Sequence, residues 1–124
     1  MKKFLVFAKF VVILSVLCAP VALATEYDVA VLQGLNKVTA RVSTFEAPIG
    51  AIIKFGKLEI TVRICDKRPP EEIPESAAFI DVWEVRPGEI PVSVYRGWMF
   101  ASSPALAAME HPVYDVWILD CKDR

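Results

Sequence analysis

The sequence predicts an all-β protein, a small antiparallel β-sandwich or barrel of about six or seven strands with one short helix before the last strand. Three observations predict it. Segments between residues 37 and 121 alternate apolar and polar residues with the period of two that is typical of half-buried strands. Proline and glycine separate these segments, as in tight turns. A serine followed by proline, which favours a helix start, precedes the final strand at Ser103.

Residues 1–24 are predicted to be a secretory signal peptide. Two lysines begin the segment, an apolar run follows, and "ALA" at residues 22–24 places small residues before a cleavage point at Thr25. An uncleaved membrane anchor is the alternative, because adding residues 4–9 makes the apolar run long enough to span a bilayer. The small residues favour cleavage. We therefore expect export to the periplasm or envelope, with residues 25–124 forming a single β domain and membrane contact only if the leader is retained.

The charge of the chain argues against a nucleic-acid partner. The chain holds 14 basic and 15 acidic residues, and three lysines but no acid lie in the leader. Residues 25–124 therefore have a net charge near −4, which offers no electrostatic footprint for nucleic acid or for an anionic membrane surface.

The cysteines predict a structural disulfide. Cys18 leaves with the leader, so Cys65 and Cys121 form an even pair with one possible connectivity. In an oxidising compartment such a pair is normally bonded. Closing a loop of about 55 residues stabilises a fold by about 4 kcal/mol in the chain-entropy model. A redox-active or metal-binding pair is the alternative, but the chain has neither a CxxC motif nor a second histidine, so we favour the structural bond.

The first strands follow from alternation. "KVTARVSTF" at residues 37–45 has strand periodicity, "APIG" turns the chain, and "AIIKF" ends at Gly56, which favours a hairpin. "KLEITVRIC" at residues 57–65 is the clearest strand. The side chains on its apolar face are Leu58, Ile60, Val62 and Ile64. Cys65 then falls on the polar side, so its bond is expected at the rim of the sheet and not in the core.

The middle of the chain contains a loop and two further strands. "DKRPPEEIPE" at residues 66–75 predicts an extended surface connector with no hydrogen bonds of its own, and docking onto an aromatic groove is the alternative use. Residues 77–85 are apolar on both sides, as in a central strand. "RPGE" predicts a type II turn with Pro87 and Gly88 in the middle, and residues 92–100 form the next strand.

The helix and the last strand complete the fold. Ser103 caps a helix of about two turns in which Leu106 and Met109 share a face, and Pro112 stops it after His111. "VYDVWILDC" then forms the last strand. The residues expected on one of its faces are Val113, Asp115, Trp117, Leu119 and Cys121.

The stretch "HPVYDVWILDC", which begins at His111, raises the question of catalysis. A hydrolase needs a nucleophile beside a base, and Ser102, Ser103 and Asp115 lie near this histidine in sequence. There is no GxSxG motif, and Ser103 already caps the helix. The dipole at the helix C-terminus explains His111 without catalysis, and Asp120, like Asp115, suits a strand edge. We expect no catalytic residues, no metal and no cofactor, and hence no enzyme.

The aromatic residues are the remaining candidates for a site. They are Trp83, Tyr95, Trp98, Tyr114 and Trp117. In so small a protein, aromatic residues on strands are more often core than ligand platform, and we favour the core interpretation. Trp98, which follows Gly97, is the first candidate for an exception.

Two long stretches carry a resemblance to a known family. They are "KVTARVSTFEAPIGAIIKFGKLEITVRICDKRPPEE" and "GWMFASSPALAAMEHPVYDVWILDC". They resemble the domain of unknown function (DUF) 2155 family, small exported proteins found mainly in alphaproteobacteria. The resemblance covers nearly all of residues 25–124, and it implies a periplasmic or envelope location and a paired Cys65 and Cys121. It supplies no activity and no catalytic residues.

We therefore expect a non-enzymatic envelope protein that binds a protein partner or supports envelope maintenance. Residues 98–109 place several large apolar side chains around a short helix, which would mark an interface if they are exposed. The candidate interface residues are Tyr95, Arg96, Trp98, Met99 and Phe100. The alternative is a glycan-binding module that stacks its ligand on Trp98 and Tyr95. If Trp98, Met99 and Phe100 all lie in the core, the interface hypothesis loses its support.

Overall fold

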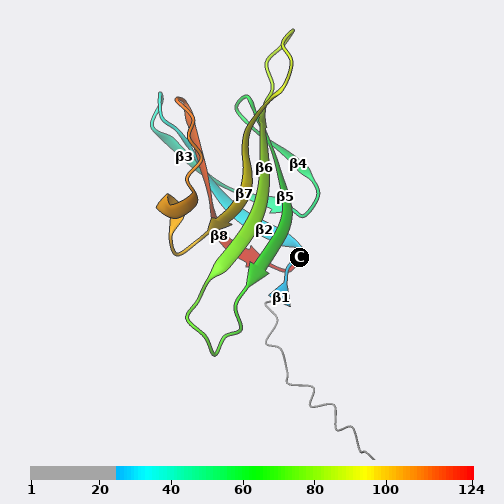
Figure 1. The fold of residues 1–124 in the computed structure, drawn as a ribbon, viewed down its shortest axis with the longest axis vertical. Coiled ribbons are helices and arrows are strands. Elements are labelled where there is room, and N and C mark those ends of the chain that lie inside the picture. The colour runs from blue at the N-terminus through cyan, green and yellow to red at the C-terminus, as the bar shows by residue number, and fades with distance from the viewer. Residues whose placement is uncertain (1–24) are drawn as a thin grey trace, which may run out of the picture.

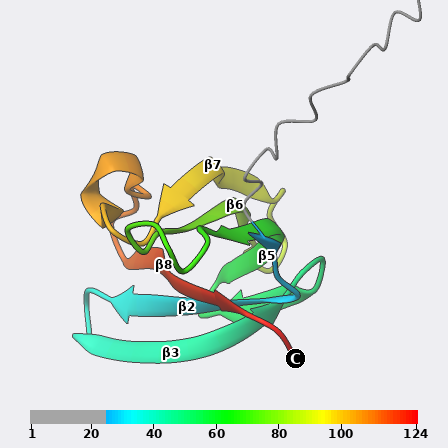
Figure 2. The ribbon, with the colours of Figure 1, turned by 90° about the horizontal axis from the view of Figure 1, so that it is seen from below.

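The computed structural model describes residues 25–124 as two antiparallel sheets packed face to face (Figures 1 and 2). The predicted leader lies outside these residues. The five-stranded sheet consists of β1 (Thr25–Glu26), β4 (Ile52–Phe55), β5 (Leu58–Lys67), β6 (Ser76–Glu84) and β7 (Val92–Phe100). The three-stranded sheet consists of β3 (Arg41–Pro48), β2 (Val29–Asn36) and β8 (Tyr114–Lys122), in that order. The predicted all-β sandwich is confirmed.

The core lies between the two sheets and follows from alternation along the strands. β5 contributes Leu58, Ile60 and Val62, and β6 contributes Ile80 and Val82, all without exposed surface. The opposite sheet contributes Ala30, Leu32, Val116 and Ile118. Burying one such aliphatic side chain stabilises a fold by about 1.5–3 kcal/mol relative to leaving it in water. The remaining alternate residues of each strand point away from the core.

Several predicted elements are confirmed. Gly56 turns β4 into β5, and β6 lies between β5 and β7 as a central strand should. The backbone N–H of Glu89 donates to the carbonyl of Arg86 at 3.1 Å, and Gly88 has a φ of 76°. This geometry is that of a type II turn.

Two predictions about the first strands are corrected. The strand predicted at residues 37–45 begins at Arg41, and β2 was not predicted at all. The reason is Asn36, whose side-chain oxygen accepts hydrogen bonds from the backbone N–H groups of Val38 and Thr39 at 3.0 and 3.3 Å. An Asn side chain bonded to the backbone two residues on stabilises a turn. Residues 37–40 therefore connect β2 to β3 and do not extend β3.

The prediction that Cys65 faces the polar side is wrong, because β5 contains a bulge. In the pairing with β6, Val62 lies opposite Ile80 and Ile64 lies opposite Phe79, so Arg63 is an extra residue. A bulge shifts every later side chain to the other face. Ile64 is consequently 36% exposed, whereas Cys65 points into the core.

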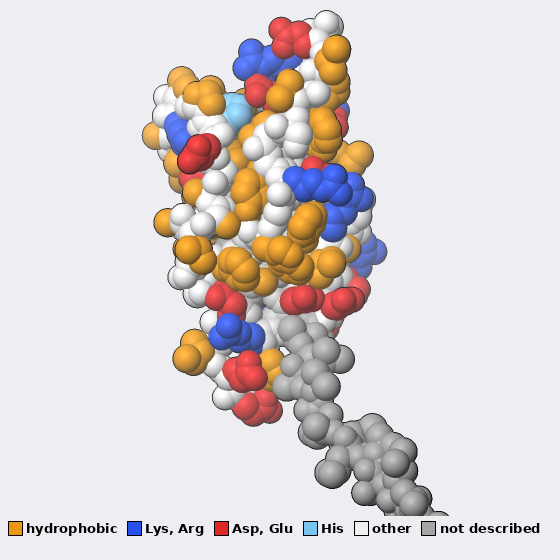
Figure 3. Space-filling model, viewed as in Figure 1, with side chains coloured by type: hydrophobic (Ala, Val, Ile, Leu, Met, Phe, Trp, Pro, Cys, Tyr) orange, Lys and Arg blue, Asp and Glu red, His pale blue; other side chains and the backbone are white. Residues whose placement is uncertain are grey.

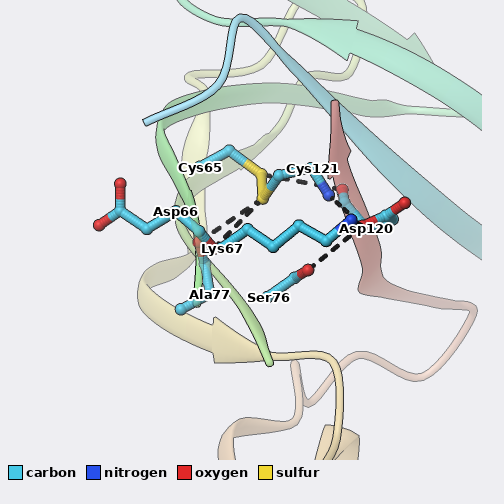
Figure 4. The surroundings of a disulfide bond; sticks show 7 residues. All are labelled: Cys65, Asp66, Lys67, Ser76, Ala77, Asp120 and Cys121. Atoms are coloured by element: carbon cyan, nitrogen blue, oxygen red, sulfur yellow. Dashed lines mark hydrogen bonds and ion pairs between the residues drawn. A yellow bond between two sulfur atoms is a disulfide. The ribbon is translucent and has the colours of Figure 1, made fainter. Parts of the chain in front are cut away.

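A second bulge brings Cys121 to the same place. The pairing of β2 with β8 skips Leu119, so Cys121 leaves the face of Trp117 and enters the core. The resulting Cys65–Cys121 disulfide has a Cα–Cα distance of 5.7 Å and joins the two sheets (Figure 4). Both cysteines are 1% exposed, so the bond lies in the core and not at the rim.

The predicted two-turn helix is also corrected. A single 3-10 turn spans Pro104–Ala107, and the Ser103 side chain makes no capping hydrogen bond. Ala108 is already extended, with a ψ of 137°. Leu106 is 78% exposed while Met109 is 2% exposed, so they share no face. Within residues 25–124 no helix is long and apolar enough to cross a bilayer.

The proline-rich loop is exposed, as predicted, but it has hydrogen bonds of its own. The N–H of Arg68 donates to the carbonyl of Glu75, and the N–H of Glu72 donates to the carbonyl of Pro69, both at 3.0 Å. The loop is therefore a closed hairpin connection between β5 and β6 that projects beyond the sandwich (Figure 1).

Candidate functional site

The outer side of the five-stranded sheet carries a row of large apolar side chains. In the strand register, Ile64 of β5, Phe79 of β6 and Trp98 of β7 are neighbours. Phe100 lies beside them on β7, and Trp83 lies on β6 beyond Asp81. We call the set formed by Ile64, Phe79, Trp83, Trp98 and Phe100 the aromatic face.

The aromatic face is open to solvent. Trp83 is 39% exposed and Trp98 is 38% exposed. The rings of Phe79 and Trp98 meet edge to face, with centroids 5.7 Å apart, a geometry that aromatic pairs favour. Figure 3, which views this side of the molecule, shows hydrophobic side chains in contact across the sheet, with Lys and Arg side chains gathered beside them.

Charged residues lie within the aromatic face. Arg96 is the cross-strand neighbour of Asp81, and Arg63, the bulge residue of β5, places its Nη2 atom 3.5 Å from Oδ2 of Asp81. The Asp81 side chain is only 6% exposed, whereas the Arg63 side chain is 56% exposed. The second oxygen of Asp81 is buried without a hydrogen-bond partner. The arginine side chains are therefore exposed at the surface, whereas the Asp81 carboxylate is buried below them.

The structure separates the predicted interface residues into two groups. Trp98, Phe100 and Arg96 lie on the aromatic face, but Met99 is 2% exposed and Tyr95 packs against the core. Tyr95 is the register partner of the buried Val82, and its hydroxyl donates to the carbonyl of Trp98 at 2.7 Å. Burial raises the pKa of the Tyr95 hydroxyl. Trp98 and Tyr95 point to opposite sides of one sheet, so they cannot form a shared stacking platform.

The core interpretation of the aromatic residues holds for two of the five, Tyr114 and Tyr95. Tyr114 is buried between the sheets, and its ring meets that of Phe55 at 5.7 Å. Trp117 is half-buried. It is the register partner of Gln33, on the outer side of the three-stranded sheet. Trp83 is exposed on the aromatic face, so the interpretation is wrong for this residue. Trp98 is also exposed there, as the exception that the sequence indicated.

Sequence reasoning named Trp83, Trp98 and Phe100 as candidates, but it missed Ile64, Phe79 and the arrangement that brings the set together. Ile64, Phe79 and Trp83, and the charged pair of Arg63 and Asp81, come from two strands other than β7. Their proximity to Trp98 depends on strand order and on the bulge at Arg63, neither of which is visible in the alternation of one segment. One signal was present in the sequence, because β6 is apolar on both sides. A sandwich strand needs apolar residues on its outer side only if that side is covered or binds a partner.

His111 is a structural residue. Its Nδ1 atom accepts hydrogen bonds from the backbone N–H groups of Val113 and Tyr114 at 3.0 and 3.1 Å, and its Nε2 atom lies 2.9 Å from Oε2 of Glu84. The ring is buried and has no free nitrogen. The helix-dipole explanation is wrong, because the 3-10 turn ends at Ala107, four residues earlier.

The other residues of the histidine-containing stretch are accounted for by local contacts. The Ser102 side chain bonds to Glu75 and not to His111. Asp120 accepts hydrogen bonds from Ser76 and from the N–H of Cys121 and pairs with Lys67 at 3.0 Å (Figure 4). Burial opposes ionisation of Asp120, but these hydrogen bonds and the Lys67 charge hold its pKa below the ordinary value.

Two cavities lie away from the aromatic face. They measure about 340 and 360 Å³; one lies beside the 3-10 turn and Trp117, and the other lies beside Lys67 and Ser102. Neither is lined by a residue of the aromatic face. Among residues 25–124, no group of three or more His, Cys, Asp or Glu side chains is arranged to hold a metal ion. The aromatic face is therefore the main candidate for a site.

Comparison with known proteins places this fold in a family. Residues 30–121 match the family described as "Uncharacterized protein conserved in bacteria (DUF2155)". The chain is also similar to the "Uncharacterized protein RP359" of Rickettsia prowazekii (strain Madrid E), with 30% identity over 87 residues. That match covers 70% of this chain and 56% of the Rickettsia protein, so the chain spans about half the length of this relative. No solved structure matches the chain. The family match covers both sheets, and the chain belongs to the DUF2155 family of bacterial proteins.

Proposed function

We propose that this protein is an exported, non-enzymatic protein of the cell envelope that binds a protein partner through the aromatic face. The observation that carries the proposal is the exposure of Trp83, Trp98 and Ile64 on the outer side of one sheet. Contiguous apolar patches on soluble proteins commonly mark interaction sites. Tryptophan and arginine are also the residue types most enriched at the energetic centres of protein interfaces.

The shape of the surface favours a protein over a glycan. Sites for small ligands are concave and surround most of the ligand. The aromatic face lies on an open sheet, and Trp98 has an edge-to-face contact with Phe79. The glycan alternative also loses one of its two stacking residues, because Tyr95 lies on the other side of the sheet. An open surface that carries tryptophan and arginine suits another protein better.

The disulfide supports the proposed location. Bonds of this kind persist in oxidising compartments and are rare in the cytosol of most organisms. The Cys65–Cys121 bond joins the two sheets inside the core, where it contributes to the stability of the whole fold. Together with the leader-like sequence of residues 1–24, this supports a periplasmic or envelope location.

Crosslinking in living cells tests the proposal. A photoreactive amino acid at position 93, beside Trp83 in the register, would report what contacts the aromatic face. We expect one protein to be captured by the otherwise unchanged chain and its yield to fall at least about tenfold with Trp98→Ala, as for a hot-spot residue. Val42→Ala is the control, because Val42 is 55% exposed on β3 of the other sheet. Equal capture by both variants, or glycan binding on an array without any captured protein, would overturn the proposal.

A further inference from the structure

The centre of the aromatic face has more positive than negative charge. Thr61, Asp81 and Arg96 are cross-strand neighbours in one row, and Arg63 reaches the same carboxylate from the bulge. Two arginines therefore flank one carboxylate, and Arg63 pairs with it. Among residues 25–124, Arg96 has no ion pair within 4.0 Å.

Asp81 does not use up the hydrogen-bonding capacity of the two arginines. Its contact with Arg63 is 3.5 Å long, whereas a charge-assisted hydrogen bond between guanidinium and carboxylate is about 2.7–2.9 Å. Each guanidinium carries five donors in a planar fork that matches a second carboxylate. Since the Arg63 side chain is 56% exposed and Arg96 is also exposed, these donors face solvent and any partner.

The other charges on this side of the sheet lie toward its two ends. Glu59, at one end of β5, lies in the row of Trp83 and is also the register partner of Lys54. Asp66 is the register partner of Glu26 at the other end. The middle row is thus cationic in a protein whose residues 25–124 have a net charge near −4. Complementary charge at an interface selects the partner and steers its approach.

The spacing of the side-chain rows on the sheet matches the spacing of side chains in an extended peptide. Along β6, Phe79, Asp81 and Trp83 are alternate residues on the outer side, so successive rows are about 7 Å apart. The arginine row therefore lies between an apolar row that contains Trp98 and a row that contains Trp83. An extended chain places the side chains of one face at the same interval.

From this geometry we infer that the partner presents an extended acidic segment, in which an Asp or Glu binds Arg63 and Arg96. Apolar residues two positions before and two positions after the acid contact the rows of Trp98 and Trp83. The inference rests on the proposed protein-binding function and specifies its partner. The chemistry is that of a peptide carboxylate flanked by apolar side chains.

Peptide selection tests the inference on a defined probe. Random 12-residue peptides displayed on phage are selected against the oxidised protein recovered after expression of the full chain. We expect the selected peptides to be enriched in apolar–x–acidic–x–apolar sequences. Their synthetic versions should bind about tenfold more weakly to Arg63→Gln and to Arg96→Gln, and more weakly as salt rises. Arg41→Gln is the matched control, because it removes the same charge from an exposed position on β3.

Asp81→Asn should change the affinity for acidic peptides in the opposite direction. It removes the carboxylate that competes for Arg63 while keeping the shape of the side chain, so acidic peptides should bind about threefold more tightly. Tighter binding that still weakens as salt rises is not expected from a damaged fold, whose newly exposed surface is apolar. Circular dichroism and urea unfolding of each variant show whether the fold is kept.

The other outcomes separate the inference from the proposed function. Peptides that need Trp98 but carry no enriched acid, or that bind the arginine variants unchanged, would overturn the inference and leave the protein-binding function in place. Peptides that bind Trp98→Ala as well as the unchanged protein, or the absence of any selected peptide, would overturn both. Arginine-dependent binding to vesicles with 30% phosphatidylglycerol, without peptide binding, would identify anionic lipid as the ligand and also overturn the inference.

Discussion

Glu84 connects the buried histidine to the surface. Its carboxylate lies 2.9 Å from Nε2 of His111, and its other oxygen pairs with Arg86 at 2.6 Å. Because Nδ1 of His111 accepts two backbone hydrogen bonds, the proton lies on Nε2 and the neutral ring donates to Glu84. These hydrogen bonds from His111 and Arg86 hold the pKa of Glu84 below its ordinary value of 4.5.

The lowered pKa predicts a pH dependence of stability. A carboxyl whose pKa is lower in the folded protein stabilises the fold fully above its unfolded pKa, and this stabilisation is lost as pH falls through the folded pKa. The free energy of unfolding of the unchanged protein should therefore exceed that of Glu84→Gln at about pH 6, and the difference should shrink below about pH 4.5. Urea unfolding of both proteins across this range measures it. A difference that is constant with pH would contradict the role of Glu84.

Two glycines offer a matched comparison. Gly56 has a φ of 57°, and a Cβ atom placed there would lie 2.6 Å from ring carbons of Tyr114. Gly50 has a φ of 83°, and nothing lies within 4 Å of its Cβ position. Gly50→Ala should lower the free energy of unfolding by about 1 kcal/mol, the cost of the backbone conformation alone. Gly56→Ala should cost about 2–4 kcal/mol, because the clash with Tyr114 adds to it. Equal losses in urea unfolding would show that the Tyr114 ring moves freely.

At the scale of the elements, the bulges in β5 and β8 create the disulfide. They turn Cys65 and Cys121 inward so that one covalent bond joins the two sheets. In the chain-entropy model this bond contributes about 4 kcal/mol. Cys65→Ala and Cys121→Ala should each lower the free energy of unfolding by about this amount, and the double variant should add little, because both changes delete the same bond. A double variant that loses the sum of the two single losses would mean that the cysteines act independently.

The bulges also mark the limit of what the sequence can predict. Alternation correctly indicated the core side of β5 from Leu58 to Val62, but the face after Arg63 depends on how β6 pairs with it. The same limit applies to the candidate site. Trp98 and Arg96 are identified on β7, whereas their neighbours on β5 and β6 become visible only with the strand order. The turn after Asn36 was missed because a side-chain hydrogen bond, and not the hydrophobic pattern, ends β2.

At the scale of the whole molecule, the two sheets share one core but differ on their outer sides. The buried apolar cluster lies between their inner sides, and the disulfide joins the two sheets from within. The outer side of the five-stranded sheet holds the aromatic face and its arginines, although the chain as a whole is acidic. A surface that concentrates tryptophan and cationic charge on one side gives the molecule a directional contact, which is what the proposed binding function requires.

We expect export to determine both where the mature protein begins and whether its disulfide forms. Export with cleavage after Ala24 should give a protein that begins Thr25-Glu26-Tyr27, with a mass two hydrogens below that of the dithiol form. A chain lacking residues 2–24 should stay in the cytosol with free thiols and unfold at lower urea concentration, because the bond worth about 4 kcal/mol is absent. Oxidation of that purified chain should restore its stability and remove the difference. N-terminal sequencing, intact mass after alkylation and urea unfolding measure these outcomes. A retained leader in the inner-membrane fraction would make the protein anchored instead, and exported protein whose thiols alkylate without reduction would contradict the predicted link between compartment and fold.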